Sequence, residues 1–154
     1  PKPLIKKRIQ GSRLMGLDDP TKKMSKSAPS PNNYIALNDP PKLAAQKIMR
    51  ATTDSGDQIK TGQKKPGITN LLSIYSLLTH TDGATLEKKF QNKGYGQFKK
   101  ELSQVVSQFL ANYQKKFQKI DDNSAAQILA QGAKKAKEIA SQKIIQVKKI
   151  VGLA

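Results

Sequence analysis

One apolar stripe in the second half of the sequence limits the folds that are open to the chain. Apolar side chains recur there at steps of three and four, at Phe98, Leu102, Val105, Val106, Phe109, Tyr113 and Phe117. This spacing places them along one face of a single long α-helix. A helix with one apolar face has to bury that face against another element. The stripe therefore favours a packed, mainly α fold of the helical-bundle kind.

Shorter amphipathic segments precede this stripe. Asp39, followed by two prolines, is expected to cap a helix whose inner face carries Leu43, Ala44, Ile48 and Ala51. Residues 54–65 are polar and contain glycine, which predicts a loop. Pro66 and Gly67 then open a second helix with inward residues Ile68, Leu71, Leu72, Tyr75 and Leu78. A shorter helix is expected after Asp82.

The last part of the chain repeats the helical pattern. From Ser124 onward the apolar positions are Ile128, Leu129, Ala136, Ile139, Ala140, Ile144, Val147 and Val151. Gly132 marks a place where this helix could bend. We found no internal repeat in the sequence, so the predicted bundle consists of unlike helices.

Charge narrows the range of partners. The 154 residues carry 28 Lys and Arg against 11 Asp and Glu, a formal net charge of +17. A polyanion is the expected partner, with nucleic acid ahead of a membrane surface. No apolar run approaches the roughly 20 residues that span a bilayer. Without cysteine, and with His80 as the single histidine, the chain offers no disulfide, thiolate metal site or thiol nucleophile. We therefore expect a cytoplasmic protein without a membrane partner.

A basic loop near the start of the chain is the segment suited to chemistry. Residues 21–31, Thr-Lys-Lys-Met-Ser-Lys-Ser-Ala-Pro-Ser-Pro, show no apolar period. Two ammonium groups and two hydroxyls, from Lys23, Ser25, Lys26 and Ser27, accompany the loop amides, a set suited to phosphate oxygens. Closed over a leaving pyrophosphate, they would stabilise its developing charge. The spacing differs from that of a Walker loop, and a short Lys-Ser stretch is also typical of a solvated basic loop.

Residues 12–17, just before this loop, predict a short β-strand. The apolar run Leu-Met-Gly-Leu ends at Asp18, Asp19 and Pro20, where a ladder cannot continue. A lone strand leaves amides and carbonyls unpaired. We therefore expect its sheet to lie in sequence that precedes Pro1.

The five residues Lys23-Met24-Ser25-Lys26-Ser27 are identical to the signature of the class I aminoacyl-tRNA synthetases. The chain resembles the tryptophanyl branch of that family in a series of ordered blocks: Met15 to Ser27, Tyr34-Ile-Ala-Leu37, Thr53-Asp54-Ser55, Lys65 to Tyr75, and Gly94-Tyr-Gly-Gln-Phe-Lys99. The series spans nearly the whole chain, which makes it far more specific than the five-residue motif. In one departure, Ala28 stands where the family usually has Asp, which puts an anchoring carboxylate of the loop in doubt.

The resemblance implies the carboxyl-terminal half of such an enzyme, divided into three parts. Residues 1–27 would be a remnant of the Rossmann nucleotide-binding domain with the motif loop, residues 28–122 the helical domain that binds the tRNA anticodon, and residues 123–154 a final helix packing back toward the nucleotide-binding domain. The implied reaction is ATP-dependent activation of tryptophan to its adenylate with release of pyrophosphate, then transfer to tRNA(Trp). ATP would bring Mg²⁺, with no protein-bound metal, and the tryptophan pocket would lie upstream. The complete enzyme is expected to be a homodimer, and the fragment alone inactive.

The resemblance also implies roles for single residues. Lys23 and Lys26 would contact the ATP phosphates as catalytic groups, while Ser25, Ser27 and the backbone of Met24 shape the loop and approach the nucleotide. The backbone of Leu14 would meet the adenine. Contacts to tRNA are not assigned; candidates for phosphate contacts, or for ordinary solvated charge, are Lys88, Lys89, Lys93, Lys99, Lys100, Lys115, Lys116 and Lys119.

Two other hypotheses remain open at this point. A stand-alone basic helical module could bind RNA without chemistry, and this hypothesis predicts strongly salt-dependent binding to tRNA. A structural or membrane-peripheral helical domain would instead show affinity for liposomes and no preference for RNA.

Overall fold

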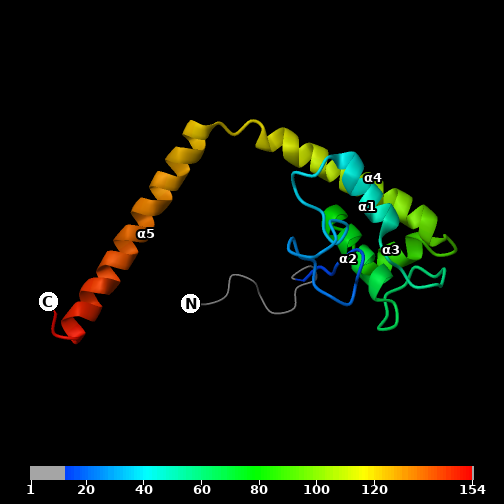
Figure 1. Cartoon of the computed structure of the whole chain (residues 1–154), viewed down its shortest axis with the longest axis horizontal. Helices are drawn as coiled ribbons and strands as arrows, with labels where there is room; N and C mark the ends of the chain where they lie inside the picture. The colour runs from blue at the N-terminus through cyan, green and yellow to red at the C-terminus, as the bar shows by residue number, and fades with distance from the viewer. Residues whose placement is uncertain (1–12, 154) are drawn as a thin grey trace. The chain divides into compact units, whose positions relative to one another are not determined.

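The computed structural model describes residues 13–153, and these residues are mainly α-helical (Figure 1). In chain order the helices are α1 (Pro41–Arg50), α2 (Pro66–Thr79), α3 (Gly83–Lys89), α4 (Tyr95–Phe117) and α5 (Asp122–Ile150). The predictions of a mainly α chain and of a loop between the first two helices are confirmed. The chain divides into two compact units, the first ending at Gln114 and the second beginning at Lys115.

Prolines and side-chain caps decide where the helices begin. As predicted, α2 opens at Pro66, and the Asp82 carboxylate caps α3 by accepting from the Thr85 amide at 3.0 Å. The predicted cap of α1 was wrong, because Pro40 rather than Asp39 is its N-cap. A residue before proline is disfavoured in the α region, and Pro40 accordingly has ψ 134°. The Asp39 carboxylate instead accepts from the ammonium of Lys47 at 2.7 Å.

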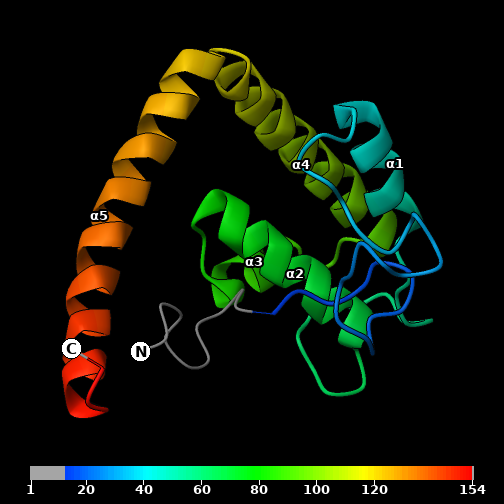
Figure 2. The ribbon, with the colours of Figure 1, turned by 60° about the vertical axis from the view of Figure 1, so that its left-hand side comes forward.

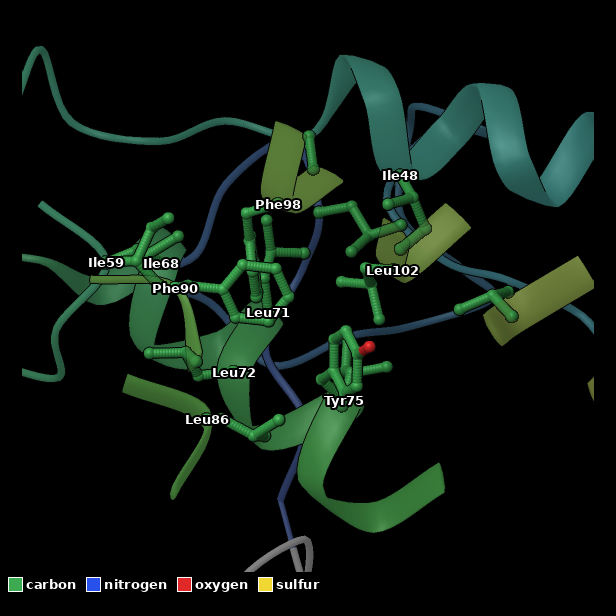
Figure 3. Packing of buried hydrophobic residues seen from close by; sticks show 14 of the residues in the cluster. Ile48, Ile59, Ile68, Leu71, Leu72, Tyr75, Leu86, Phe90, Phe98 and Leu102 are labelled. Carbon is green, nitrogen blue, oxygen red and sulfur yellow. The ribbon is translucent and has the colours of Figure 1, made fainter. Parts of the chain in front are cut away.

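Helix α2 supplies a large part of the core of the first unit (Figure 3). The core residues labelled there are Ile48, Ile59, Ile68, Leu71, Leu72, Tyr75, Leu86, Phe90, Phe98 and Leu102, all buried. The rings of Phe90 and Phe98 meet edge to face with centroids 4.9 Å apart, and Tyr75 lies within 6.0 Å of both. Aromatic pairs in these geometries add stabilisation beyond their buried area.

Helix α1 runs antiparallel to the first half of α4 (Figure 2). The ammonium of Lys99, near the start of α4, donates to the carbonyl of Ala51 at the end of α1, at 2.7 Å. Further along α4, the Ser107 hydroxyl donates to the carbonyl of Pro41 at the start of α1, at 3.0 Å. These contacts fix the register of the two helices. We call the part of the first unit formed by α1 to α4 the helical body.

The apolar stripe of α4 is only partly buried. Phe98, Leu102 and Val106 are buried, and Leu110 joins them, but Phe109 and Phe117 are 43% and 61% exposed. The expectation that these two rings pack in the core was wrong. Helix α1 begins beside Ser107, so it does not extend along the last turns of α4. On α1, Leu43 was likewise expected to point inward and is 39% exposed.

Helix α5 forms most of the second unit. The Asp121 carboxylate caps it by accepting from the amide of Ser124 at 2.8 Å. The helix is continuous through Gly132, where a bend was considered, and it ends at Ile150 with Val151 as its C-cap. Gly152, the next residue, has φ 74°. None of its described residues is buried. Its predicted apolar positions are therefore open to solvent within this unit.

The predicted strand before the basic loop does not form in the described residues; Ser12 lies outside them. Met15 instead makes one isolated antiparallel bridge with Lys23. The argument that these residues need an upstream sheet also fails for Met15 and Leu17. Both have their amide and carbonyl bonded by other parts of this chain.

Candidate phosphate-binding loop

The basic loop folds back on the residues that precede it. The amide of Gly16 donates to the carbonyl of Lys22 at 2.8 Å, and the amide of Met24 donates to the carbonyl of Leu14 at 3.0 Å. These two bonds flank the bridge between Met15 and Lys23. Residues 14–16 and 22–24 therefore form one paired unit. Leu14 and Met24, which the family resemblance assigns to the nucleotide, are direct neighbours in it.

The other edge of this unit is held by a side chain of helix α2. Asn70 Oδ1 accepts from the amide of Met15 at 2.9 Å, and Asn70 Nδ2 donates to the carbonyl of Met15 at 2.8 Å. Asn70 is buried. Its amide takes the place of a neighbouring strand, which explains why Met15 needs no sheet.

Asn33 holds the loop from a second direction. Its Oδ1 accepts from the amide of Ser25 at 3.0 Å, and its Nδ2 donates to Asp18 Oδ1 at 2.6 Å. Its carbonyl accepts from the amide of Leu17 at 2.9 Å. The bond from Asn33 is the main reason that the pKa of the Asp18 carboxyl is lowered. Asn33 is buried, so these directional bonds are shielded from water.

Close backbone approach requires glycine at two positions around the loop. A Cβ added to Gly16 would lie 2.2 Å from Asn33 Nδ2 and 2.8 Å from the carbonyl of Asp19. A Cβ on Gly67 would lie 2.2 Å from the carbonyl of Thr52. Thr52 in turn donates its amide to the carbonyl of Leu17 at 2.7 Å. Gly67 thus lets the start of α2 approach the segment that carries the loop.

The two lysines of the motif are directed to solvent. Lys23 and Lys26 are exposed, and neither makes an ion pair with another described residue. Lys22, by contrast, pairs with Asp19 at 3.0 Å. Hydrogen bonds from Thr21, and then from Lys22, lower the pKa of Asp19 to about 2. The acidic residue nearest in sequence is therefore occupied, and the charges of Lys23 and Lys26 remain available to an anion.

The two serines of the motif form a tight turn. Ser25 Oγ and Ser27 Oγ lie 2.9 Å apart, and the amide of Ser27 donates to Ser25 Oγ at 3.3 Å. The amide of Ala28 donates to the carbonyl of Ser25 at 3.3 Å. The turn thus forms with alanine at position 28, where the family usually has a carboxylate.

The candidate RNA-contacting lysines differ in what they already bind. Lys89 and Lys93 lie over the ring of Phe90 and pair with Glu101. Desolvation lowers the pKa of Lys99, which is partly buried and bonded to Ala51. The remaining candidates are exposed: Lys88, Lys100, Lys115, Lys116 and Lys119. These five lysines are better placed to meet a phosphate than the three with internal partners.

Tyr95, the aromatic residue that no apolar stripe explains, closes the polar loop at residues 54–65. Its hydroxyl lies 2.8 and 2.9 Å from the two carboxylate oxygens of Asp54, and Lys65 Nζ donates to it at 3.2 Å. Burial, followed by the bond to Asp54, raises the pKa of Tyr95. His80 is the C-cap of α2 with φ 55°.

A cavity lies away from the motif loop, beside α3. It has a volume of about 630 Å³ and is lined by Asp57, Gln58, Ile59, Lys60, Ala84, Glu87, Lys88, Phe90, Gln91, Asn92, Lys93 and Gly94. It includes none of the motif residues.

Within residues 13–153 there is no group of three His, Asp or Glu side chains that could hold a metal ion. In the same residues, every helix is too short or too polar to cross a membrane.

Sequence reasoning missed the residues that anchor the loop, namely Asn33, Asn70, Gly16 and Thr52. Asn70 gave one signal, since it is an amide side chain inside the apolar run that opens α2. Its contact lies 55 residues away along the chain, so no local pattern identifies its partner.

Comparison with known proteins shows the family of this chain. Residues 1–111 match the family described as tRNA synthetases class I (W and Y), and the chain belongs to that family. Within it, the chain is 44% identical over 153 residues to the tryptophan–tRNA ligase of Helicobacter pylori. It is also 44% identical over 154 residues to that of Caldanaerobacter subterraneus. The resemblance to the tryptophanyl branch is thereby confirmed.

The chain spans less than half the length of these relatives. It matches each over 99% of its own residues and 46% of theirs. Its structure resembles the crystal structure of tryptophanyl-tRNA synthetase from Mycoplasma pneumoniae, with a TM-score of 0.85 and 34% sequence identity. That match covers 92% of this chain and 44% of the other.

Proposed function

We propose that this chain provides the carboxyl-terminal part of a tryptophan–tRNA ligase. The complete enzyme would activate tryptophan with ATP, release pyrophosphate and transfer the tryptophanyl group to tRNA(Trp). The observation that carries this proposal is the motif loop, whose two lysines are exposed and unpaired among the described residues while its backbone is tied to Leu14. The names of the relatives support the choice of tryptophan.

Lys23 and Lys26 are the residues to which we assign the chemistry. Charge builds on the β- and γ-phosphates as the carboxylate of tryptophan attacks the α-phosphorus and pyrophosphate departs. Two ammonium groups held beside that charge lower the barrier to the extent that they bind the transition state better than ATP. The amides around Met24, with Ser25 and Ser27, would approach the nucleotide, and the backbone of Leu14 would meet the adenine. Mg²⁺ would arrive on the phosphates of ATP.

The three parts of the chain receive separate roles in this proposal. Residues 1–27 would complete a Rossmann nucleotide-binding domain, and residues 28–122 would bind the anticodon region of the tRNA. Residues 123–154 would pack toward the nucleotide-binding domain, which would cover the exposed apolar side chains of α5. The tryptophan pocket and most of a homodimer interface would be supplied by upstream sequence. We assign the enzyme to the cytoplasm, with no membrane partner.

The test uses tryptophan-dependent exchange of pyrophosphate into ATP. In the complete enzyme, Lys26→Ala is expected to lower kcat for adenylate formation while leaving the KM for tryptophan nearly unchanged, because the charge acts on the departing phosphates. Unchanged turnover in this variant would refute the assignment of the loop. The isolated chain is expected to show no exchange, and measurable exchange by it would contradict the proposed division of the active site.

A basic RNA-binding module without catalysis is the second candidate, and the net charge of +17 is the observation that favours it. It predicts tight, salt-dependent binding of tRNA by the isolated chain, with no requirement for an upstream domain. In that case, the change Lys26→Ala would weaken RNA binding rather than adenylate formation.

A further inference from the structure

The paired unit at residues 14–16 and 22–24 gives Lys23 a fixed backbone position. Met15 lies opposite Lys23, and the bonds from Gly16 and Met24 lock the two segments in register. A displacement of Met15 would therefore be passed to Lys23. Any group that fixes the backbone of Met15 therefore also fixes the backbone of Lys23, from which the Lys23 side chain extends.

Asn70 is that group. It binds both polar groups of the Met15 backbone, at 2.9 and 2.8 Å, so it fixes orientation as well as position. The residue is only 5% exposed. A buried amide costs free energy unless it is hydrogen-bonded, and an apolar side chain in place of Asn70 would leave the amide and carbonyl of Met15 without these partners. Packing alone therefore gives no reason for an asparagine on this face of α2.

Lys26 depends on a different anchor. The last amide of the motif that is bound to a side chain outside the motif is that of Ser25, which donates to Asn33 Oδ1 at 3.0 Å. Among the described residues, the hydrogen bonds of Ser27 and Ala28 are local, to Ser25. Lys26 lies between Ser25 and Ser27, one residue beyond the anchored amide of Ser25. Its backbone is thus placed through Asn33 and the short turn, and not through Asn70.

We infer that Asn70 and Asn33 are positioning residues for two different lysines, with Asn70 on α2 setting the place of Lys23 and Asn33 setting the place of Lys26. The inference rests on the function proposed above, in which the lysines act on the phosphates of ATP. It gives helix α2 a direct mechanical connection to the loop. A shift of α2 would be passed to the backbone of Lys23 through the side chain of Asn70.

The anchors are tested first in this chain, by amide hydrogen exchange followed by NMR. Asn70→Ala is expected to speed exchange of the Met15, Gly16 and Met24 amides by about tenfold or more, because two hydrogen bonds are lost. Asn33→Ala is expected to do the same for Ser25. Amides of α4 serve as the internal reference. The matched controls are Asn112→Ala on α4 and Asn32→Ala beside Asn33, and neither should alter exchange in the loop.

Asn70→Leu guards against a variant that does not fold. Leucine fills nearly the same volume without the two hydrogen bonds, so the core of the helical body should persist while the loop amides still exchange faster. Loop exchange that is unchanged in a folded Asn70→Leu variant would overturn the inference.

The second test is kinetic, in the complete enzyme, with pyrophosphate exchange as the readout. A displaced catalytic group costs up to about 100-fold in rate, and we expect Asn70→Ala to lower kcat by about 10- to 100-fold without raising the KM for tryptophan. Combined with Lys23→Ala, Asn70→Ala should add less than about threefold, because the lysine that it positions is gone. Combined with Lys26→Ala, it should keep its full effect. Asn33→Ala should show the reverse pattern.

The outcomes separate the two levels of the proposal. If Lys23→Ala and Lys26→Ala leave pyrophosphate exchange unchanged, the proposed function of the loop fails, whatever the asparagines do. If the lysine variants are slow but each asparagine substitution lowers the rate by the same factor in the Lys23→Ala and Lys26→Ala backgrounds, the assignment of one asparagine to each lysine is wrong.

Discussion

The helical body and the motif loop are two neighbouring regions held in place by different forces. In the body, the rings of Tyr75, Phe90 and Phe98 pack together and are buried. In the loop, Leu14 and Met24 also pack against the core, but the position of the backbone is set by hydrogen bonds from the side chains of Asn33 and Asn70. Apolar burial is strong but has little direction, whereas a hydrogen bond is weaker and sets position. Loss of either asparagine side chain can therefore displace the backbone of the loop while the core of the body stays folded.

The largest expected effect is a loss of stability in the helical body. Phe98→Ala removes a fully buried ring that contacts two others, and it should lower the free energy of unfolding by about 3 to 5 kcal/mol. Urea denaturation followed by circular dichroism measures this loss. Phe117→Ala, at a ring that is 61% exposed, is the control on the same helix. Equal losses in the two variants would contradict the assignment of the core.

Gly16→Ala tests the loop without touching the core. The added Cβ would meet Asn33 Nδ2 and the carbonyl of Asp19, so the loop must shift, and a cost of about 1 to 3 kcal/mol is expected. Gly83→Ala is the control, since a Cβ there meets nothing within 4 Å. Amide exchange should show the change at Leu17 and Ser25 and not in α4. If the Ser25 amide of Gly16→Ala were as protected from exchange as in the unchanged chain, the close approach of Gly16 to Asn33 would be contradicted.

Tyr95→Phe tests a polar contact inside the body itself. The change removes the hydroxyl shared by Asp54 and Lys65, and it should cost about 1 to 2 kcal/mol. Burial tends to raise the pKa of Asp54, but hydrogen bonds from Tyr95 and Gly56 outweigh this effect and lower it. A lowered carboxyl pKa contributes stability that is present above the ordinary value near 3.8 and is lost as the pH falls. In Tyr95→Phe the loss of stability with acid should be smaller, as thermal melts between pH 6 and roughly pH 3 would show.

The smallest expected effect is the titration of Asp19. Its pKa of about 2 lies below the ordinary 3.8, so its contribution to the loop is present above about pH 4 and is lost between about pH 4 and 2. NMR should show the amides of Thr21 and Lys22 shifting in this range. In Asp19→Asn that step should be absent, and its persistence would assign the titration to another group.

Local patterns in the sequence predicted the helices well but not the anchors of the loop. The starts of α2 and α3 follow from Pro66 and Asp82, because capping and proline geometry act over a few residues. The exposure of Phe109 could not be predicted, since it depends on where α1 begins. The position of the motif in a loop was predicted from the residues of that segment. The roles of Asn33 and Asn70 were not, because an asparagine carries no signal for a partner that is distant in sequence.

The bond between Met15 and Asn70 also has a consequence for the order of folding. The two residues are 55 positions apart, and a ribosome adds roughly 5 to 20 residues per second. The motif segment is therefore synthesised several seconds, on the order of 3 to 10 s, before the helix that holds it. Helices form in about a microsecond, so α2 can fold almost as soon as it emerges. The part of the chain with the most demanding geometry is thus made early and takes its final position late.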